Sequence, residues 1–284
     1  MINHQMHRVY QGNLPLCPHF PSAPFPSGRR IHTNAASSGR SARLGTKSRA
    51  QTLGATETLS FDRELLQAHD RAVELFDVIE SEDLLQPGEK EQDINTKIFE
   101  LTAARFGTRK HWHKRLVRTG ENTIHPIFVD TPDRVLQQDD IAFIDLGPVF
   151  GNLEADFART YVIGDDQRKH DLAAALPQIF TKCKQFYQSR PDMTGAELYD
   201  FVYKTCKEFG YVYGNGYCAH LLGEFAHKTR YGLEDINFAR TENNVPMSEP
   251  APNGDKRYWV LEIHILQDPA VGTYGGFYED LLNL

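Results

Sequence analysis

Residues 141–163 read IAFIDLGPVFGNLEADFARTYVI, two apolar segments that each lie next to an aspartate. The first segment is rich in isoleucine and phenylalanine, as a buried strand is, and it ends at Asp145. Asp156 follows eleven residues later, after a stretch with two glycines and a proline, which are typical turn residues. A β-hairpin of this length would return Asp156 to the side of Asp145.

Two buried carboxylates this close repel each other unless cations or several hydrogen-bond donors lie between them. The segment therefore predicts a cation site at Asp145 and Asp156. The residues alone also allow a simpler interpretation, in which one aspartate lies in an exposed turn and the other is a cap.

The C-terminal part of the chain supplies further acids and histidines in apolar surroundings. Residues 258–265 alternate between apolar and polar side chains, which places Glu262 and His264 together on the polar face of a predicted strand. Glu279 lies in a second apolar segment, and His220 precedes both. Acids and imidazoles are common metal ligands, so these side chains are candidates for the same site.

Helical and strand-like patterns occur twice in the same order. Helical spacing of apolar residues is found in residues 65–79, 89–106, 169–187 and 194–209. Strand-like segments follow each pair of helices, at residues 127–129, 141–145 and 157–163 in the first half and after Gly210 in the second. The repetition predicts two helix-helix-sheet halves related by a pseudo-twofold axis, with a ligand site between them.

The first 56 residues differ in composition from the rest. They contain seven basic residues and no acid, although the whole chain of 284 residues has a net charge of −7. They are rich in proline, serine and arginine and bury too little apolar surface to fold, which predicts an unstructured tail. The same composition is also typical of an organelle transit peptide. Residues 57–284 are expected to form the folded domain.

The composition argues against several classes of protein. The acidic charge outside the first 56 residues disfavours nucleic-acid binding. No run of about 18 apolar residues is present, so no membrane span is expected. The four cysteines show no C-x-x-C spacing, which fits buried thiols in a reducing compartment better than disulfides or a structural zinc site.

The order of the polar motifs resembles metallopeptidase family M24, which includes methionine aminopeptidase, aminopeptidase P, prolidase and creatinase. The motifs are Asp145, Asp156 followed by Arg-Thr, His-x-x-Gly at His220, and then Glu262 and Glu279. The resemblance extends over nearly the whole predicted domain and makes it a catalytic domain. It implies the α+β pita-bread fold, in which two pseudo-symmetric halves surround a central antiparallel sheet.

The resemblance also implies a pair of divalent metal ions. Asp145 would bind the first ion, and His220 and Glu262 would bind the second. Asp156 and Glu279 would bridge both. Four carboxylates and one imidazole favour Mn²⁺, Co²⁺ or Fe²⁺, and Zn²⁺ is also able to bind. A hydroxide between the two ions would be the nucleophile.

The resemblance also gives catalytic or substrate-facing roles to three residues. Glu262 would carry the proton to the leaving nitrogen, and His227 would donate a hydrogen bond to the scissile carbonyl or the tetrahedral intermediate. His125, directly before Pro126, matches the substrate-facing histidine of relatives at a slightly longer spacing. The alternative interpretation of His125 is a turn residue.

Several positions depart from the family pattern. Relatives usually have Pro-Gly where this chain has Ile263-His264, so His264 is expected either to enter the site as an extra donor or to lie on an exposed strand edge. Phe277 occupies a position where aminopeptidase P and prolidase commonly have arginine, which weakens a proline-specific interpretation and makes it a substrate-binding candidate. Residues 111–114, HWHK, are expected either to line the pocket mouth or, preferably, to form a solvated junction between helix and strand.

The resulting prediction is a dinuclear metallohydrolase, aminopeptidase-like, that acts on a peptide or small amide substrate. Two alternatives stay open: an enzyme of the same fold that cleaves a small non-peptide C–N bond, as creatinase does, and a catalytically silent peptide-binding module. Neither nucleic acid nor a membrane is an expected partner, and a homodimer is allowed. The expected compartment is the cytoplasm, or a mitochondrion or chloroplast if the N-terminal segment is a transit peptide.

Overall fold

The computed structural model describes residues 47–190, 192–227, 235–251 and 254–284, and of residues 47–59 and Asp235 it describes only the backbone. Most of the predicted tail therefore lies outside the described residues. The first described element, helix α2, begins at Lys47, which is earlier than the helical spacing in the sequence predicts.

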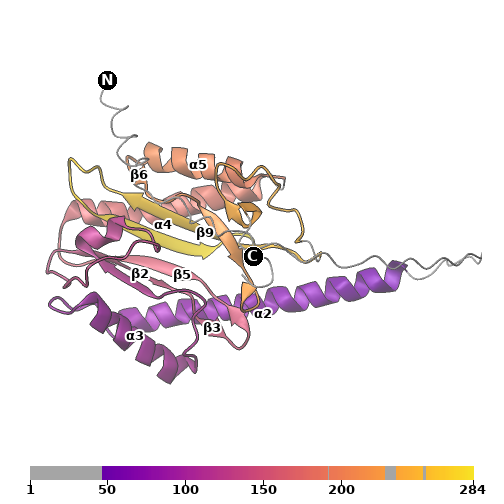
Figure 1. Cartoon of the computed structure of the whole chain (residues 1–284), viewed down its shortest axis with the longest axis horizontal. Coiled ribbons are helices and arrows are strands. Elements are labelled where there is room, and N and C mark those ends of the chain that lie inside the picture. Colours follow the sequence, from indigo (N-terminus) through magenta and orange to yellow (C-terminus); the bar gives the residue numbers. More distant parts are fainter. Residues whose placement is uncertain (1–46, 191, 228–234, 252–253) are drawn as a thin grey trace, which may run out of the picture. The chain divides into compact units, whose positions relative to one another are not determined.

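An antiparallel sheet forms the centre of the described part of the chain (Figure 1). Its strands lie in the order β1-β2-β5-β10-β9-β7-β8, and β6 pairs with the end of β9. The strand bounds are β1 Leu116–Thr119, β2 Ile141–Leu146, β5 Phe157–Val162, β6 Val212–Tyr213, β7 Ala219–Leu222, β8 Phe238–Ala239, β9 Tyr258–Leu266 and β10 Gly275–Leu281. The order places β2 and β5 of the first half beside β10 and β9 of the second, as two pseudo-symmetric halves require.

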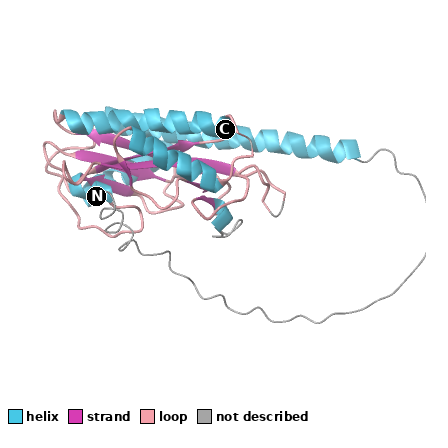
Figure 2. Cartoon of the chain, turned by 90° about the horizontal axis from the view of Figure 1, so that it is seen from above, coloured by secondary structure: helices cyan, strands magenta, loops and turns pink. Residues whose placement is uncertain are grey.

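Four α-helices of the described residues cover one face of this sheet (Figure 2). They are α2 (Lys47–Ser81), α3 (Glu91–Phe106), α4 (Gln167–Gln188) and α5 (Gly195–Glu208). Ile144 of β2 packs with α2 and α3, and Leu261 of β9 packs with α4 and α5. Because side chains alternate along a strand, the neighbouring Asp145 and Glu262 project from the opposite face. None of the described helices is long and apolar enough to cross a bilayer.

The helix ends follow local sequence signals. Helix α3 ends at Gly107, whose φ of 69° lies in the left-handed region that glycine enters without strain. Helix α5 begins with a capping box, in which the side chain of Thr194 accepts from the backbone of Glu197 and the Glu197 side chain accepts in return. At the start of α4 the side chain of Asp166 accepts a hydrogen bond from the backbone N–H of Arg168. These signals explain why the helices lie close to their predicted positions.

The prediction of a strand at residues 127–129 is wrong. This segment is a turn, in which the backbone N–H of Val129 donates to the carbonyl of Pro126 at 3.1 Å. The carbonyls of Pro126 and Val129 accept hydrogen bonds from the buried guanidinium of Arg118, at 3.3 Å and 2.6 Å, and so are not available to a sheet. The first strand is instead β1, which pairs with β2 and which no sequence pattern singled out.

A short hairpin connects β2 to β5, as the spacing of the two aspartates predicts. Its strands, β3 (Val149–Phe150) and β4 (Leu153–Glu154), pair antiparallel. Gly151 forms the turn with a φ of 63°. Strand β5 then runs back along the whole of β2, so the chain returns Asp156 to the level of Asp145.

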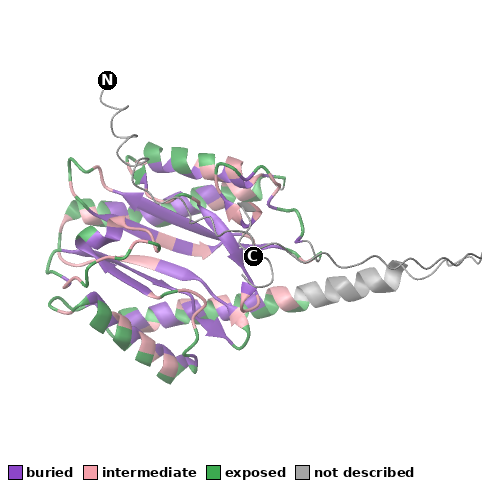
Figure 3. Cartoon of the chain, in the orientation of Figure 1, coloured by how far each residue is buried: buried purple, intermediate pink, exposed green. Residues whose placement is uncertain are grey.

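Strands β2 and β9, which carry Asp145 and Glu262, are buried along their whole length (Figure 3). The three cysteines within the described residues, Cys183, Cys206 and Cys218, are also buried, and they are free thiols. This confirms the expectation of buried thiols for these three, and Cys17 lies outside the described residues.

Candidate metal centre

Three acids lie in one row across the sheet, on the face opposite the helices. Ala158 of β5 pairs with Asp145 of β2 on one side and with Glu279 of β10 on the other. Glu279 pairs in turn with Glu262 of β9. Directly paired residues of antiparallel strands project to the same face, so three carboxylates flank the small side chain of Ala158. Asp156 lies two residues before Ala158, directly before the start of β5, and joins the row from there.

His220 of β7 faces three of these carboxylates with one ring nitrogen. Its Nε2 lies 3.3 Å from Oδ2 of Asp156, 3.2 Å from Oε1 of Glu262 and 3.2 Å from Oε1 of Glu279. Its Nδ1 lies 2.9 Å from the carbonyl oxygen of Leu221. Burial alone would lower the pKa of His220, but the carboxylates raise it well above the usual value. The structure therefore brings His220 together with three of the predicted ligands.

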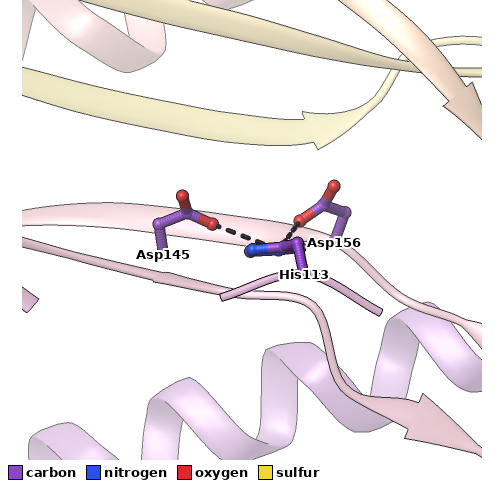
Figure 4. Close-up of side chains that lie close together, drawn as sticks. All are labelled: His113, Asp145 and Asp156. Atoms are coloured by element: carbon purple, nitrogen blue, oxygen red, sulfur yellow. Dashed lines mark hydrogen bonds and ion pairs between the residues drawn. The ribbon is translucent and has the colours of Figure 1, made fainter. Parts of the chain in front are cut away.

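A second imidazole, that of His113, faces the other end of the acid cluster (Figure 4). Its Nε2 lies 3.0 Å from Oδ1 of Asp156 and 3.5 Å from Oδ1 of Asp145. Its side chain is only 6% exposed, so the expected solvated junction at residues 111–114 is wrong for this residue, because backbone hydrogen bonds bind the segment to the turn after β2. Burial would lower the pKa of His113, but the charges of Asp145 and Asp156 raise it to about 9.

The cluster contains more negative charge than its histidines are able to neutralise. Its four carboxylates and two imidazoles are each no more than 7% exposed. Oδ1 of Asp145 is buried and accepts no hydrogen bond. Burial raises the pKa of Asp145 to about 7, and burial together with the charge of Asp156 raises the pKa of Glu279 well above its ordinary value. Buried negative charge in this excess is stable only with cations or protons.

The geometry of the donors fits cations. Ligand atoms of His113, Asp145 and Asp156 lie within 4.8 Å of one another. Ligand atoms of Asp156, His220 and Glu279 form a second such group, also within 4.8 Å of one another. Asp156 belongs to both groups. Burial alone would raise the pKa of Asp156, but the hydrogen bonds and charges of His113 and His220 have the larger effect and lower it. Two groups of oxygen and nitrogen donors that share one carboxylate are suited to a pair of divalent ions.

His227 lies beside the cluster but is bound to a different acid. Its backbone N–H donates to Oε1 of Glu154 at 3.0 Å, and its Nδ1 is hydrogen bonded to Oε2 of the same carboxylate. The ring of Trp112 lies next to all three histidines, with its centroid 5.0 Å from that of His227, 4.5 Å from that of His113 and 5.3 Å from that of His220. Trp112 thus connects His227 to the cluster.

His264 and Phe277 contribute to an aromatic wall on the acid-bearing face. Each lies two residues from an acid of the cluster, and Phe143 of β2 completes the wall. The ring centroid of Phe143 lies 6.2 Å from that of His264 and 5.5 Å from that of Phe277. His264 is buried on the interior strand β9, and its Nε2 lies 2.9 Å from the carbonyl oxygen of Thr123. The expectation of an exposed strand edge for His264 is therefore wrong.

His125 lies at the periphery of the cluster. It follows the 3₁₀ helix η1 (Gly120–Ile124) and is half-buried. Among the described residues, no hydrogen bond joins its ring to the acids. Burial and the positive charge of Arg118 lower the pKa of His125, and the same Arg118 is close enough to Asp145 to be affected by its charge.

Residues 63–254, more than half of the chain, match the model of metallopeptidase family M24. The chain belongs to family M24. The match ends before β9 and β10, so Glu262 and Glu279 lie beyond it. The strand pairing and the contacts with His220 nevertheless place both acids in the same cluster.

Known M24 proteins of similar sequence or structure share the fold. An Xaa-Pro dipeptidase of Pyrococcus furiosus is 23% identical over 164 residues, which are 57% of this chain and 45% of that protein. An X-Pro aminopeptidase from Thermotoga maritima superimposes with a TM-score of 0.58 at 19% identity, over 79% of this chain and 61% of that one. Aminopeptidase P from E. coli superimposes with a TM-score of 0.56 at 15% identity, over 77% of this chain and 52% of that one. The chain thus has the pita-bread fold and spans less than two thirds of the length of these relatives.

Several residues beside the acid cluster gave no signal in the sequence. Nδ2 of Asn215 donates to Oε2 of Glu262 at 2.7 Å. Burial and the charges of Glu262 and Glu279 raise the pKa of Tyr217 well above its usual value, so its hydroxyl keeps its proton next to the acids. A lone asparagine or tyrosine in a loop has no periodic pattern and no characteristic spacing. Glu154 was inconspicuous because its strand, β4, has only two residues and so shows no alternation.

Glu154→Gln should lower turnover without removing metal. The amide would lose the charged hydrogen bond to Nδ1 of His227, so the ring would no longer be held in one orientation. We expect kcat to fall by about tenfold or more, as for other buried partners that orient a site histidine. Steady-state kinetics and metal content measure the two effects, with the exposed Glu121→Gln as the matched control. An unchanged kcat in a folded Glu154→Gln protein would exclude this role.

Proposed function

We propose that this M24 chain is a hydrolase that uses two divalent cations to cleave a peptide or amide bond near a free amino group. The observation that carries the proposal is the position of Asp156. Its Oδ1 faces His113 at 3.0 Å and its Oδ2 faces His220 at 3.3 Å. A carboxylate shared by two groups of donors is the arrangement that holds two cations side by side in two-metal hydrolases.

The ligand roles follow the position of each acid in the cluster. Asp145 would hold one cation, and His220 and Glu262 the other. Asp156 and Glu279 would be shared. The excess of carboxylate donors supports Mn²⁺, Co²⁺ or Fe²⁺ and also allows Zn²⁺. When bound, such a pair of ions activates water near neutral pH and polarises a carbonyl group.

Glu262 is the proposed carrier of the proton. The Nδ2 of Asn215 holds its Oε2 at 2.7 Å, whereas its Oε1 faces the cluster and lies 3.2 Å from Nε2 of His220. The carboxylate is thereby fixed in one orientation beside the cluster, where Glu262 would accept a proton and pass it to the leaving nitrogen.

Two histidines would bind the substrate. Glu154 accepts from Nδ1–H of His227, and a ring that also carries a proton on Nε2 would donate from there to a substrate carbonyl oxygen. His125 lies farther out, next to the positive charge of Arg118, and would contact the part of the substrate beyond the scissile bond.

The aromatic wall of Phe143, His264 and Phe277 favours substrates that have an apolar side chain. The three rings are buried on the same face of the sheet as the acids. Apolar and aromatic surfaces bind apolar groups such as a leucine side chain or a proline ring. Peptides with an apolar residue at the scissile bond, X-Pro peptides included, are therefore the proposed substrates.

Metal analysis of the purified protein combined with a substrate screen tests this proposal. We expect about two divalent ions per chain at saturation and hydrolysis of apolar aminoacyl or X-Pro peptides. An N-acetylated copy of the best substrate is the matched control and should resist cleavage. A protein that binds no divalent ion, or that cleaves only a small C–N substrate such as creatine, would contradict the proposal.

A further inference from the structure

We propose that His113 is a metal ligand of this chain, a second imidazole that binds the same cation as Asp145 and Asp156. The inference rests on the proposed function and extends its ligand set of four carboxylates and one imidazole. It gives each of the two cations one histidine, His113 from the segment before β1 and His220 from β7.

The distances at His113 are those of neighbouring ligands on one ion. Its Nε2 lies 3.0 Å from Oδ1 of Asp156 and 3.5 Å from Oδ1 of Asp145. Nε2 of His220 has distances of 3.2 to 3.3 Å to its own carboxylates. Two donors that each lie about 2.1 Å from one ion, at octahedral or tetrahedral angles, are separated by about 3.0 to 3.4 Å. The contacts of His220 lie within this range, and those of His113 lie at its lower limit and 0.1 Å above its upper limit.

The ring of His113 is held in the orientation that a metal ligand needs. Its Nδ1 lies 2.8 Å from the carbonyl oxygen of Lys114. A carbonyl oxygen only accepts, so Nδ1 carries a proton, and a cation at the acids would take the place of the proton on Nε2. His220 is held in the same way, with Nδ1 at 2.9 Å from the carbonyl of Leu221. Metal-binding histidines in proteins usually have such a backbone or carboxylate partner at the other nitrogen.

The absence of a side chain at Gly147 leaves space for the imidazole of His113. A Cβ atom added to Gly147 would lie 2.2 Å from Cδ2 and 2.4 Å from Nε2 of His113. The backbone N–H of Trp112 donates to the carbonyl of Gly147 at 2.9 Å, and its Nε1–H donates to the carbonyl of Ala155 at 3.1 Å. These contacts hold His113 directly over the turn that follows Asp145. The position of the ring is therefore built into the backbone and does not depend on a flexible surface segment.

A direct test uses the full-length protein loaded with Co²⁺ and proton NMR. A histidine that binds paramagnetic Co²⁺ through Nε2 gives one strongly shifted, exchangeable Nδ1–H signal. We expect two such signals in the wild-type protein, from His113 and His220, and one in His113→Ala. A single signal in a wild-type protein that holds two Co²⁺ ions would overturn the proposal, and this result does not depend on the folding of any variant.

Metal affinity provides the second measurement. His113→Ala should weaken Co²⁺ binding at one of two sites by about tenfold or more, and change the visible absorption of the Co²⁺ protein. His111→Ala removes an imidazole two residues away that packs against Phe99, and it should leave both sites unchanged. Equal affinities and spectra for wild type and His113→Ala would contradict the ligand role. A wild-type protein that binds no divalent ion would instead contradict the proposed function itself, so the two failures are distinguishable.

Discussion

Asp156→Asn should lose bound metal and hydrolytic activity together. Both oxygens of the Asp156 carboxylate face imidazoles of the cluster, at 3.0 Å from His113 and 3.3 Å from His220. The amide of asparagine keeps the shape but has one acceptor oxygen and no charge, so it cannot be shared by two cations. The loss of two-metal stabilisation amounts to about 4 kcal/mol or more of the activation free energy, which lowers kcat by about 10³-fold or more.

The measurement is kcat with the best substrate, together with the number of divalent ions that stay bound after gel filtration. Asp165→Asn is the matched control, because it makes the same chemical change at an exposed residue near the end of β5. It should keep both ions and full activity. Retention of full hydrolysis by Asp156→Asn would rule out the shared-ligand role of this carboxylate.

Removal of the divalent ions by a chelator should abolish hydrolysis and lower the thermal stability of the protein. Without cations the cluster keeps four buried carboxylates against two imidazoles, and burial already raises the pKa of Asp145 to about 7. Ions that bind only the folded chain stabilise it by about 2.7 kcal/mol at a concentration of about 100 times Kd. For a domain of this size that free energy corresponds to a rise in Tm of about 5 to 10 °C.

Calorimetry of the chelated protein, before and after Mn²⁺ or Co²⁺ is added back, measures this effect. Activity assayed on the same samples should return together with the higher Tm. An equal ionic strength of NaCl is the control for general screening and should not restore either property. A chelated protein with an unchanged Tm and full activity would show that no divalent ion belongs to this site.

The sequence by itself determined the secondary structure in its long, regular parts. The alternation in residues 258–265 correctly predicted a strand with its apolar side chains on one face and Glu262 on the other, because β-strand side chains alternate whatever the rest of the chain does. Local capping and turn residues likewise fixed the ends of α3 and α5 and the hairpin between the two aspartates. The order of acids around His220 was sufficient to indicate family M24, as the family match confirms.

The tertiary structure alone decided which other side chains join that site. The four residues of β1 have no recognisable pattern, so the chain gave no reason to place the segment before them, and with it His113, over the turn after Asp145. The same holds for Glu154, whose partner His227 lies 73 positions away. Periodicity and capping depend on neighbours within a few residues, whereas these contacts depend on which strands pair across the sheet. That pairing is set by the burial of the whole core, which no single stretch of sequence contains.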